Sequence, residues 1–242
     1  MLFYGLAGFI LIIAASFIRR TKDKYEDFCV GAAIPIFLFM LLPLALATSW
    51  LRPLTIDGSL RAIDLALGLD GFALRRWLIS RHYDFFLVLY FVYPTLPLLM
   101  ALAWVLERPR TLLRAAVIGA VLAFPLYLLF PAVGPEYAFS NFPSASAHLV
   151  PVAWFHPRNC VPSMHFTWAL LLVVNISSWR WRWIFIVYAL LMAFATVVGG
   201  EHYFIDVLAA IPFTIAVQKV AELHALRSQR LSSVPQSVRV TS

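Results

Sequence analysis

The feature that most constrains the fold is a series of seven apolar runs, most of them long enough to cross a bilayer. They cover residues 2–18, 28–51, 84–106, 112–130, 163–179, 183–199 and 202–222. A transmembrane helix needs about 20 predominantly apolar residues. Only 13% of the 242 residues are charged, against about a quarter in a soluble domain. The sequence therefore predicts an all-α fold, a polytopic membrane helix bundle of six to seven transmembrane helices.

The chain contains no segment with the composition of a separate soluble domain. We therefore expect residues 1–226 to form a single membrane-embedded domain. The run 2–18 is the weakest span, and it does not resemble a signal peptide because the cations Arg19 and Arg20 follow it. Residues 227–242 are rich in Ser, Gln, Pro and Arg, which predicts a disordered cytoplasmic tail.

Basic residues are distributed unevenly between the loops that connect the runs. Of the 19 Lys and Arg residues, 13 lie in one alternate set of loops: 19–27, 107–114, 180–182 and the segment from 219. The positive-inside rule places this set in the cytoplasm. The C-terminus would then be cytoplasmic, and His165 and His202 would lie at the outer, periplasmic or lumenal, face. We expect an integral protein of a bacterial inner membrane or an equivalent membrane.

The stretch 53–83 is too charged to span a bilayer. Its apolar residues recur at helical spacing: Ile56, Leu60, Ile63 and Leu67. Its charged residues share another face: Asp57, Arg61 and Asp64. This pattern favours an amphipathic helix in the outer interface, with a plain connecting loop as the alternative. The outer loop 131–162 is rich in Pro, Gly, Ser and aromatic residues, and we interpret it as a folded lid or substrate entrance.

The net charge of +7 does not indicate a nucleic-acid partner. Membrane topology accounts for the cations, and no basic stripe interleaves with exposed aromatic residues. The two cysteines, Cys29 and Cys160, are predicted near opposite membrane faces, so we expect no disulfide between them. Neither cysteine has the spacing of a zinc site.

Polar residues precede or open two of the apolar runs, and such residues mark functional-site candidates. The first cluster is Cys160-Val161-Pro162-Ser163-Met164-His165. Proline at a helix start costs no internal hydrogen bond, and Ser163 is a suitable N-cap. The free amides of that first turn form an anion site, which His165 would face.

The second cluster is Gly199-Gly200-Glu201-His202-Tyr203-Phe204-Ile205-Asp206. His202 and Asp206 are four residues apart and hence on one helix face. A carboxylate beside an imidazole fixes its tautomer, which makes the other ring nitrogen a better nucleophile or base. The two glycines permit a tight turn and the close approach of a ligand.

Each cluster alone has a simpler explanation. A histidine at a helix end can be an interfacial or packing residue, and a His–Asp pair can be purely structural. Both clusters, however, start predicted spans at the same membrane face, and a tight turn at 180–182 would bring these spans side by side. A zinc site from His165, His202 and Asp206 is a less favoured alternative, since phosphoryl transfer also explains the amide-rich turn.

At these residues the chain resembles the type 2 phosphatidic acid phosphatase superfamily, over roughly residues 55–215. The second superfamily motif, Pro-Ser-Gly-His, corresponds to Pro162-Ser163-Met164-His165. The third motif is Ser-Arg, five residues, His, three residues, Asp. Here it reads Ala195-Thr196, five residues, His202, three residues, Asp206. The first motif, Lys, six residues, Arg-Pro, has its best counterpart in Tyr127, six residues, Gly134-Pro135.

The His, His and Asp positions match the superfamily, whereas its three cationic phosphate ligands are missing. In this respect the chain is similar to the branch that contains inositol phosphorylceramide synthase and sphingomyelin synthase. That branch keeps a His and a His-Tyr-x-x-Asp element without those cations. The element here runs from His202 to Asp206, and the segment from Phe130 to Pro135 is similar to the Pro-rich first motif of the branch.

The resemblance implies a role for each of these residues. His202 would form a phosphohistidine, Asp206 would orient and charge-balance it, and His165 would act as general acid and then as base. Ser163 and Arg158 would bind phosphate oxygens. Further candidates for substrate contact are Tyr203, His156 and Tyr127. Other candidate cations are His156, Arg75, Arg76 and Arg81, with headgroup anchoring as the alternative for the arginines. No metal and no other cofactor is implied.

The sequence thus predicts a membrane lipid phosphotransferase that moves a phosphoryl-headgroup unit between lipids, with a phospholipid or lipid phosphate as substrate. One alternative is a lipid phosphate phosphatase that uses water as the acceptor. The other is a non-catalytic membrane transporter or lipid-binding protein, which the lack of a visible inverted repeat disfavours. No pattern in the chain indicates the donor and acceptor lipids or the oligomeric state.

Overall fold

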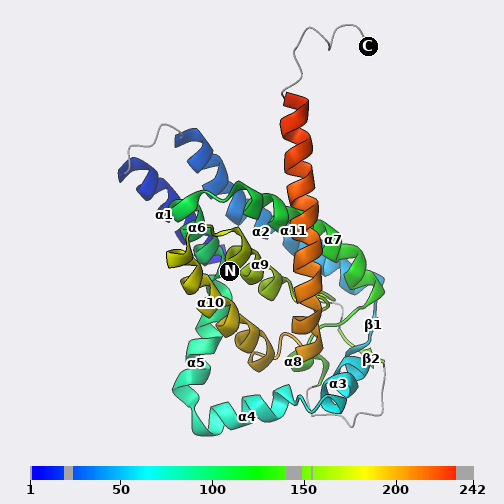
Figure 1. Cartoon of the computed structure of the whole chain (residues 1–242). Helices are drawn as coiled ribbons and strands as arrows, with labels where there is room; N and C mark the ends of the chain where they lie inside the picture. Colours follow the sequence, from blue (N-terminus) through cyan, green and yellow to red (C-terminus); the bar gives the residue numbers. More distant parts are fainter. Residues whose placement is uncertain (1, 19–23, 140–148, 154, 233–242) are drawn as a thin grey trace, which may run out of the picture.

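The computed structural model describes residues 2–18, 24–139, 149–153 and 155–232 (Figure 1). Its helices in chain order are α1 (Leu2–Ile18), α2 (Lys24–Leu51), α3 (Asp57–Ala66), α4 (Gly71–Arg81), α5 (Tyr83–Val92), α6 (Leu96–Glu107), α7 (Arg110–Leu129), α8 (Pro135–Ala138), α9 (Met164–Asn175), α10 (Trp179–Val198) and α11 (Phe204–Ser232). The 3₁₀ turn η1 (Tyr93–Thr95) links α5 to α6. The two-residue strands β1 (Leu54–Thr55) and β2 (Val150–Pro151) pair antiparallel. The described residues otherwise form helices and loops, which confirms the predicted all-α fold.

Five helical segments are long and apolar enough to cross a membrane, by their length and composition. They are α2, the α5–α6 segment (Tyr83–Glu107), α7, α10 and α11 up to Arg227. The predicted runs 2–18 and 163–179 form shorter apolar helices, α1 with 17 residues and α9 with 12. The chain is therefore an integral membrane protein. Helix α11 continues to Ser232, into the segment expected to be disordered, and residues 233–242 lie outside the described residues.

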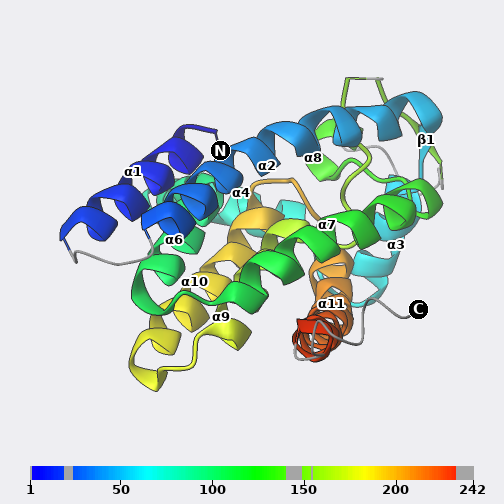
Figure 2. The same cartoon turned by 90° about the horizontal axis from the view of Figure 1, so that it is seen from above.

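Helix α9 lies inside the bundle and contacts α6, α7, α10 and α11 (Figure 2). At about 1.5 Å per residue, its 12 residues cover only part of a hydrocarbon layer about 30 Å thick. Ala169, Leu171 and Leu172 are fully buried, so protein surrounds most of this helix, although Val174 near its end is 52% exposed. Small residues on α7 allow a close approach, and the Trp168 indole donates a hydrogen bond to the Ala116 carbonyl at 3.3 Å.

Carboxylates hold together the end of the bundle at which α9 ends and α10 begins. Asp27, buried near the start of α2, accepts hydrogen bonds from Arg108 Nη2 at 2.9 and 2.8 Å and from the Trp104 indole at 3.1 Å. Glu107 accepts from the amides of Ser177 and Ser178, immediately before α10. These contacts tie α2, α6 and the α9–α10 turn together.

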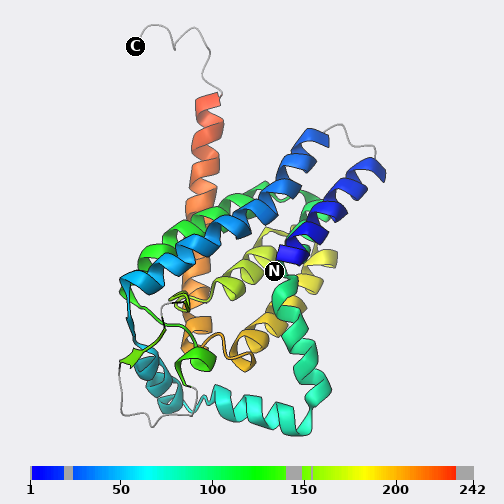
Figure 3. The same ribbon diagram turned by 180° about the vertical axis from the view of Figure 1, so that it is seen from behind.

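The predicted interfacial helix is two helices, α3 and α4, which lie across the end of the bundle where α11 begins (Figures 1 and 3). The charged face of α3 is not solvated, because Asp57 and Asp64 are 0% and 5% exposed. Both carboxylates turn inward, where they accept hydrogen bonds from backbone amides. The Arg61 guanidinium packs over the rings of Phe72 and Phe139, 5.0 and 5.2 Å from their centroids.

The described parts of the loop 131–162 pack against the same end of the bundle. The Pro131 carbonyl accepts from the Ile56 amide at 2.8 Å, and the Ala132 carbonyl accepts from the Cys160 amide at 3.2 Å. Ala132 is fully buried, so this part of the predicted lid is packed into the protein. Residues 140–148 of the loop lie outside the described residues.

Candidate active site

His165 lies in the first turn of α9, and Ser163 fixes the start of that helix. The Ser163 side chain accepts a hydrogen bond from the Phe166 amide at 3.4 Å, which confirms the predicted cap. Ser163 is fully buried, and its own amide donates to the Asp206 carbonyl at 3.3 Å. This contact joins the start of α9 to the first turn of α11 and brings the two polar clusters together.

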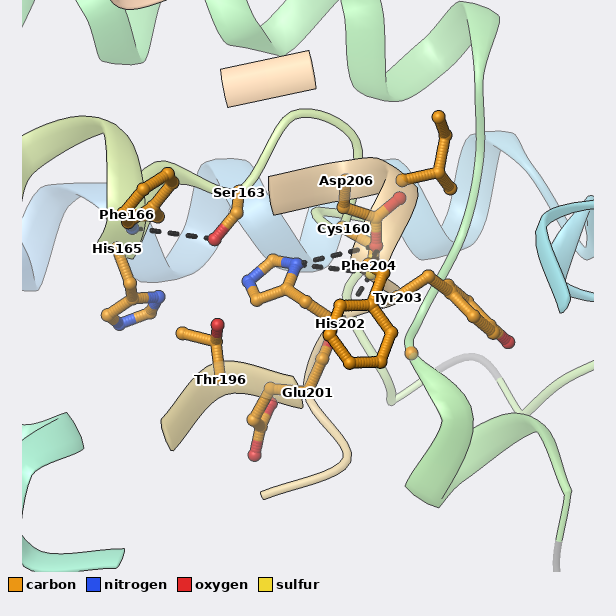
Figure 4. A network of polar contacts seen from close by, with 12 residues as sticks. Cys160, Ser163, His165, Phe166, Thr196, Glu201, His202, Tyr203, Phe204 and Asp206 are labelled. Carbon is orange, nitrogen blue, oxygen red and sulfur yellow. Dashed lines mark hydrogen bonds and ion pairs between the residues drawn. The ribbon is translucent and has the colours of Figure 1, made fainter. Parts of the chain in front are cut away.

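The rings of His165 and His202 lie next to each other, with centroids 6.3 Å apart (Figure 4). Nδ1 of His165 is 2.9 Å from the hydroxyl of Tyr93, the first residue of η1. The tyrosine hydroxyl can donate to Nδ1 of a neutral imidazole and can accept from Nδ1–H of an imidazolium. Tyr93 thus orients the His165 ring in either protonation state.

His202 lies in a tight turn between α10 and α11. Helix α10 is followed by Gly199, and Gly200 adopts φ +80°, in the left-handed region that favours glycine. The amides of Glu201 and His202 both donate to the Thr196 carbonyl at 3.1 Å. The turn holds His202 at only 4% exposure, so its ring lies inside the protein beside His165.

Nδ1 of His202 faces both Asp206 and Cys160. The distance from Nδ1 to Asp206 Oδ2 is 3.6 Å, beyond ordinary hydrogen-bond length. Cys160 Sγ contacts both groups, at 3.3 Å from Nδ1 and 2.7 Å from Oδ2 (Figure 4). Asp206 Oδ2 also accepts from the Tyr203 amide at 2.8 Å. Cys160, His202 and Asp206 offer donor atoms within 4.8 Å of one another, a set of the kind that could hold a metal ion.

Asp57 supports the site through the loop that precedes α8. Its carboxylate accepts from the amides of Val133 and Gly134, at distances of 3.2 and 3.0 Å, and from the Tyr203 hydroxyl at 2.9 Å. Burial raises the pKa of Asp57 above its ordinary value, while these hydrogen bonds favour the ionised form. One carboxylate therefore connects α3, the 131–134 loop and the residue after His202.

Asp64, two turns later on α3, caps the start of α11. It accepts from the amides of Phe204 and Ile205 at 2.8 and 2.9 Å. These amides are among the first of α11 and have no partner inside their own helix. Burial raises the pKa of the Asp64 carboxyl to about 6. The cap fixes the first turn of α11, on which Asp206 lies.

Gly134 allows the 131–136 loop to pack directly on the His202 turn. It adopts φ +95°, and a Cβ at this position would lie 2.3 Å from the Glu201 carbonyl oxygen. The Glu136 amide donates to the Gly200 carbonyl at 2.9 Å. Arg75 pairs with the Glu136 carboxylate beside Gly200. The counterpart of the first motif is thus a backbone contact and not a cationic clamp.

An apolar cavity of about 610 Å³ lies between α2 and α7 and reaches His165. Figure 3 shows these two helices side by side. Phe39 and Leu42 of α2 and Val121 and Phe124 of α7 are among the lining residues. Val121 is 66% exposed, so the cavity is open towards the surface that a bilayer would cover. A cavity of this size and polarity is suited to a hydrocarbon chain.

Arg158, the expected phosphate ligand, is fully buried and occupied by the backbone. Its three guanidinium nitrogens donate to five carbonyl oxygens, those of Arg52, Pro53, Val152, Ala153 and His156. A guanidinium has five N–H groups, so none remains for a phosphate. The predicted phosphate role is therefore corrected: Arg158 joins the loop before the first polar cluster to the end of α2.

The three expected substrate contacts have different surroundings. Tyr127 is buried in α7 and lines the apolar cavity. The hydroxyl of Tyr203 donates a hydrogen bond to Asp57, so its role is structural. The His156 ring lies against that of Tyr137, with centroids 4.7 Å apart, and the Tyr137 hydroxyl donates to Glu201 at 2.9 Å.

Sequence reasoning missed four groups that complete the site: Tyr93, Cys160, Asp57 and Asp64. Tyr93 falls within an apolar run rich in aromatic residues, where nothing distinguishes it. Asp57 and Asp64 are part of an amphipathic pattern that is typical of a solvated helix face. Cys160 belongs to the first cluster and precedes Ser163 by three residues, and this proximity was the one available signal.

The fold and the site together define a class of protein: a membrane-embedded helical bundle with two histidines and an aspartate gathered at one end, beside an apolar cavity. The sequence model of the PAP2 superfamily matches residues 58–220, and the chain belongs to this superfamily. Its members are phosphatases or phosphotransferases that act on lipid phosphates in a bilayer. No curated protein and no solved structure matches the chain.

Proposed function

We propose that this chain is a lipid phosphotransferase, with residues 1–226 as its catalytic domain. It moves a phosphoryl-headgroup unit from a phospholipid to a hydroxyl-bearing lipid. The observation that carries the proposal is the pair His165 and His202, with ring centroids 6.3 Å apart, where His165 lines the apolar cavity. A second observation is the lack of a cationic phosphate ligand. The three motif cations are missing, and Arg158 donates all its guanidinium N–H groups to five backbone carbonyls. Both observations support a relation to the branch that contains inositol phosphorylceramide synthase and sphingomyelin synthase.

In the first half-reaction, Nε2 of His202 attacks the phosphorus of the donor phospholipid. The bond between phosphorus and the diacylglycerol oxygen breaks, and the headgroup phosphate remains on His202. Asp206 holds the far side of the ring and balances the positive charge that develops on it. His165, as the imidazolium with a proton on each ring nitrogen, protonates the departing alkoxide, which leaves as diacylglycerol while His165 becomes neutral.

In the second half-reaction, the acceptor hydroxyl gives its proton to His165 and attacks the same phosphorus. The phosphorus–nitrogen bond breaks, and His202 is restored with the headgroup phosphate now on the acceptor. With a lipid phosphate monoester as the donor and water as the acceptor, the same residues would give the phosphatase reaction. The cavity between α2 and α7 supports a lipid acceptor, because it offers apolar walls to an acyl chain next to His165.

We also propose that the site lies at the outer membrane face with the C-terminus in the cytoplasm. The uneven distribution of Lys and Arg between the loops supports this orientation. A C-terminal fusion to a reporter that is active only in the cytoplasm tests it. A reporter active only on the outer side would reverse the assignment.

The reaction is tested with purified full-length protein in vesicles that contain a phospholipid labelled with ³²P in its headgroup phosphate. Hydroxyl-bearing lipids other than diacylglycerol, such as ceramide, are supplied as acceptors. We expect label on an acceptor lipid, with one unlabelled diacylglycerol released per transfer. A failure to label any acceptor lipid, together with free labelled phosphate released from a ³²P-labelled lipid phosphate monoester, would establish the phosphatase alternative.

Variants locate the chemistry. His202→Asn and His165→Asn are each expected to lower turnover at least about 100-fold. His224→Asn is the matched control, because His224 is an exposed histidine on α11 outside the site. Protein denatured at alkaline pH, where the acid-labile phosphorus–nitrogen bond survives, should carry label in the absence of an acceptor, and His202→Asn should lack this label. Full turnover in both site variants would rule out the two histidines as catalytic residues, and a wild type that turns over no lipid phosphate would restore the non-catalytic alternative.

A further inference from the structure

Cys160 is the member of the buried cluster to which no motif gives a role. Its Sγ lies 2.7 Å from Asp206 Oδ2, 3.1 Å from the Glu201 carbonyl oxygen and 3.3 Å from His202 Nδ1. The direct distance between Nδ1 and Oδ2 is 3.6 Å. The thiol is 1% exposed. Imidazole and carboxylate are therefore connected through the sulfur more closely than they are to each other.

The chemistry of the three groups assigns the direction of each hydrogen bond. A thiol has one proton to donate, and an ionised carboxylate oxygen at 2.7 Å is the strongest acceptor within its reach. The sulfur lone pairs then remain for the N–H of His202, at 3.3 Å. With Nδ1 protonated, the lone pair of the neutral ring is on Nε2, as an attack on phosphorus requires.

The protonation state of the thiol supports this arrangement. Burial and the neighbouring Asp206 carboxylate raise the pKa of Cys160 well above its ordinary value, so the neutral thiol persists at physiological pH. A neutral thiol can donate and accept at once, whereas a thiolate could only accept. It would also repel the carboxylate at this short distance.

The same three residues could instead be metal ligands. Zinc bond lengths and tetrahedral angles place a thiolate sulfur and a carboxylate oxygen about 3.6 Å apart. The observed separation of Sγ and Oδ2 is 2.7 Å, too short for two ligands of one zinc ion. The geometry therefore favours the hydrogen-bonded cluster over a zinc site.

We propose that Cys160 is a positioning residue for His202: its thiol accepts the hydrogen bond of Nδ1, donates its own proton to Asp206, and so holds Nε2 ready for attack. The catalytic consequence rests on the proposed function, but the effect on the histidine tautomer does not. The substitution Cys160→Ser retains one donor and one acceptor, and Cys160→Ala removes both. Cys29→Ser is the matched control, because Cys29 is the exposed cysteine on α2.

The first measurement is the ¹⁵N NMR spectrum of histidine-labelled full-length protein in detergent micelles, with the His202 signals assigned by their loss in His202→Asn. We expect the Nδ1–H tautomer in the wild type, in Cys29→Ser and in Cys160→Ser. Cys160→Ala should populate the Nε2–H tautomer. Should Cys160→Ala fail to fold, Cys160→Val fills the space without a donor and replaces it.

The second measurement is phosphoryl-transfer kinetics of the same variants. Cys160→Ala should lower kcat about 10- to 100-fold with little change in KM, and Cys160→Ser should recover most of the loss. An unchanged tautomer or an unchanged kcat in Cys160→Ala would overturn the positioning role. So would stoichiometric zinc retained by the wild type and lost with the thiol. A different result is that the tautomer changes as expected between the wild type and Cys160→Ala while the wild type transfers no phosphoryl group. That result refutes only the proposed function.

Discussion

The hydroxyl of Tyr93 lies 2.9 Å from Nδ1 of His165, and the centroids of the two rings are 4.1 Å apart. The tyrosine belongs to the short 3₁₀ turn between α5 and α6, whereas the histidine belongs to the first turn of α9. Their contact orients the ring proposed to protonate the leaving group. It also connects the α5–α6 segment to α9.

Tyr93→Phe should slow the reaction because it removes this hydrogen bond and leaves the ring packing in place. The loss of one neutral hydrogen bond is expected to lower kcat up to about tenfold, with KM nearly unchanged. Steady-state kinetics with the labelled donor measure both constants. Tyr83→Phe, which alters an exposed tyrosine of α5, is the control, and an equal effect in both variants would contradict the role of Tyr93.

Gly134→Ala should disrupt the His202 turn, because the new Cβ would meet the Glu201 carbonyl oxygen at 2.3 Å. Activity is expected to fall by about tenfold or more, and the melting temperature should also decrease. Gly68→Ala is a matched control, since Gly68 also has a positive φ but no atom within 4 Å of its Cβ position. Its cost should be limited to the left-handed backbone, about 1 kcal/mol, with activity retained. Equal losses in the two variants would rule out the contact with Glu201 as the cause.

The protein should show a pH-dependent stability contribution from Asp64. Its carboxyl has a pKa of about 6 in the fold and about 3.9 in an unfolded chain. Between these values the folded state holds a proton that the unfolded state has released, so the contribution falls as pH rises through this window. Asp64→Asn cannot ionise and should lack this fall.

Thermal unfolding in detergent between pH 4 and pH 7 measures the difference between wild type and Asp64→Asn. Relative to the variant, the wild type should lose stability as the pH rises. Asp84→Asn, at an exposed position at the start of α5, is the control and should run parallel to the wild type. Parallel curves for Asp64→Asn as well would mean that Asp64 has the same proton affinity in both states.

Filling the cavity between α2 and α7 should weaken binding of long-chain lipids. Val121→Trp adds an indole to the α7 wall, so KM for a long-chain acceptor should rise several-fold while a short-chain acceptor is used normally. Leu190→Trp is the control, because Leu190 is an exposed residue of α10 that does not line this cavity. An unchanged ratio of the two KM values in Val121→Trp would show that acyl chains bind elsewhere.

The helices could be predicted from the sequence because a bilayer demands apolar side chains over whole spans. Each of the seven runs corresponds to a helix or to the α5–α6 segment, within a few residues at most boundaries. The predicted run 163–179 extends past the end of α9 at Asn175, because Ile176 and Trp179 continue the apolar pattern across the polar Asn175, Ser177 and Ser178. That end depends on Glu107, which binds the amides just before α10.

The site was predictable where its residues are close in the chain. His202 and Asp206 are separated by one helical turn, and Ser163 caps the helix of His165 as its position indicates. Contacts such as that between Tyr203 and Asp57, 146 residues apart, leave no local signal. Arg158 was misassigned because a cation near the first cluster resembles a phosphate ligand, and only the tertiary structure shows which acceptors it meets.

The Asp64 cap on α11 also has a consequence for biosynthesis. Asp64 is translated about 140 residues before Phe204 and Ile205, whose amides it binds. Its carboxylate therefore lacks these two hydrogen-bond donors until the last helix, α11, has been inserted. A nascent chain that stops after α10 contains His165 and Tyr93 but neither His202 nor Asp206. Catalytic competence would then appear only when synthesis is almost complete, which protects membrane lipids from a half-assembled enzyme.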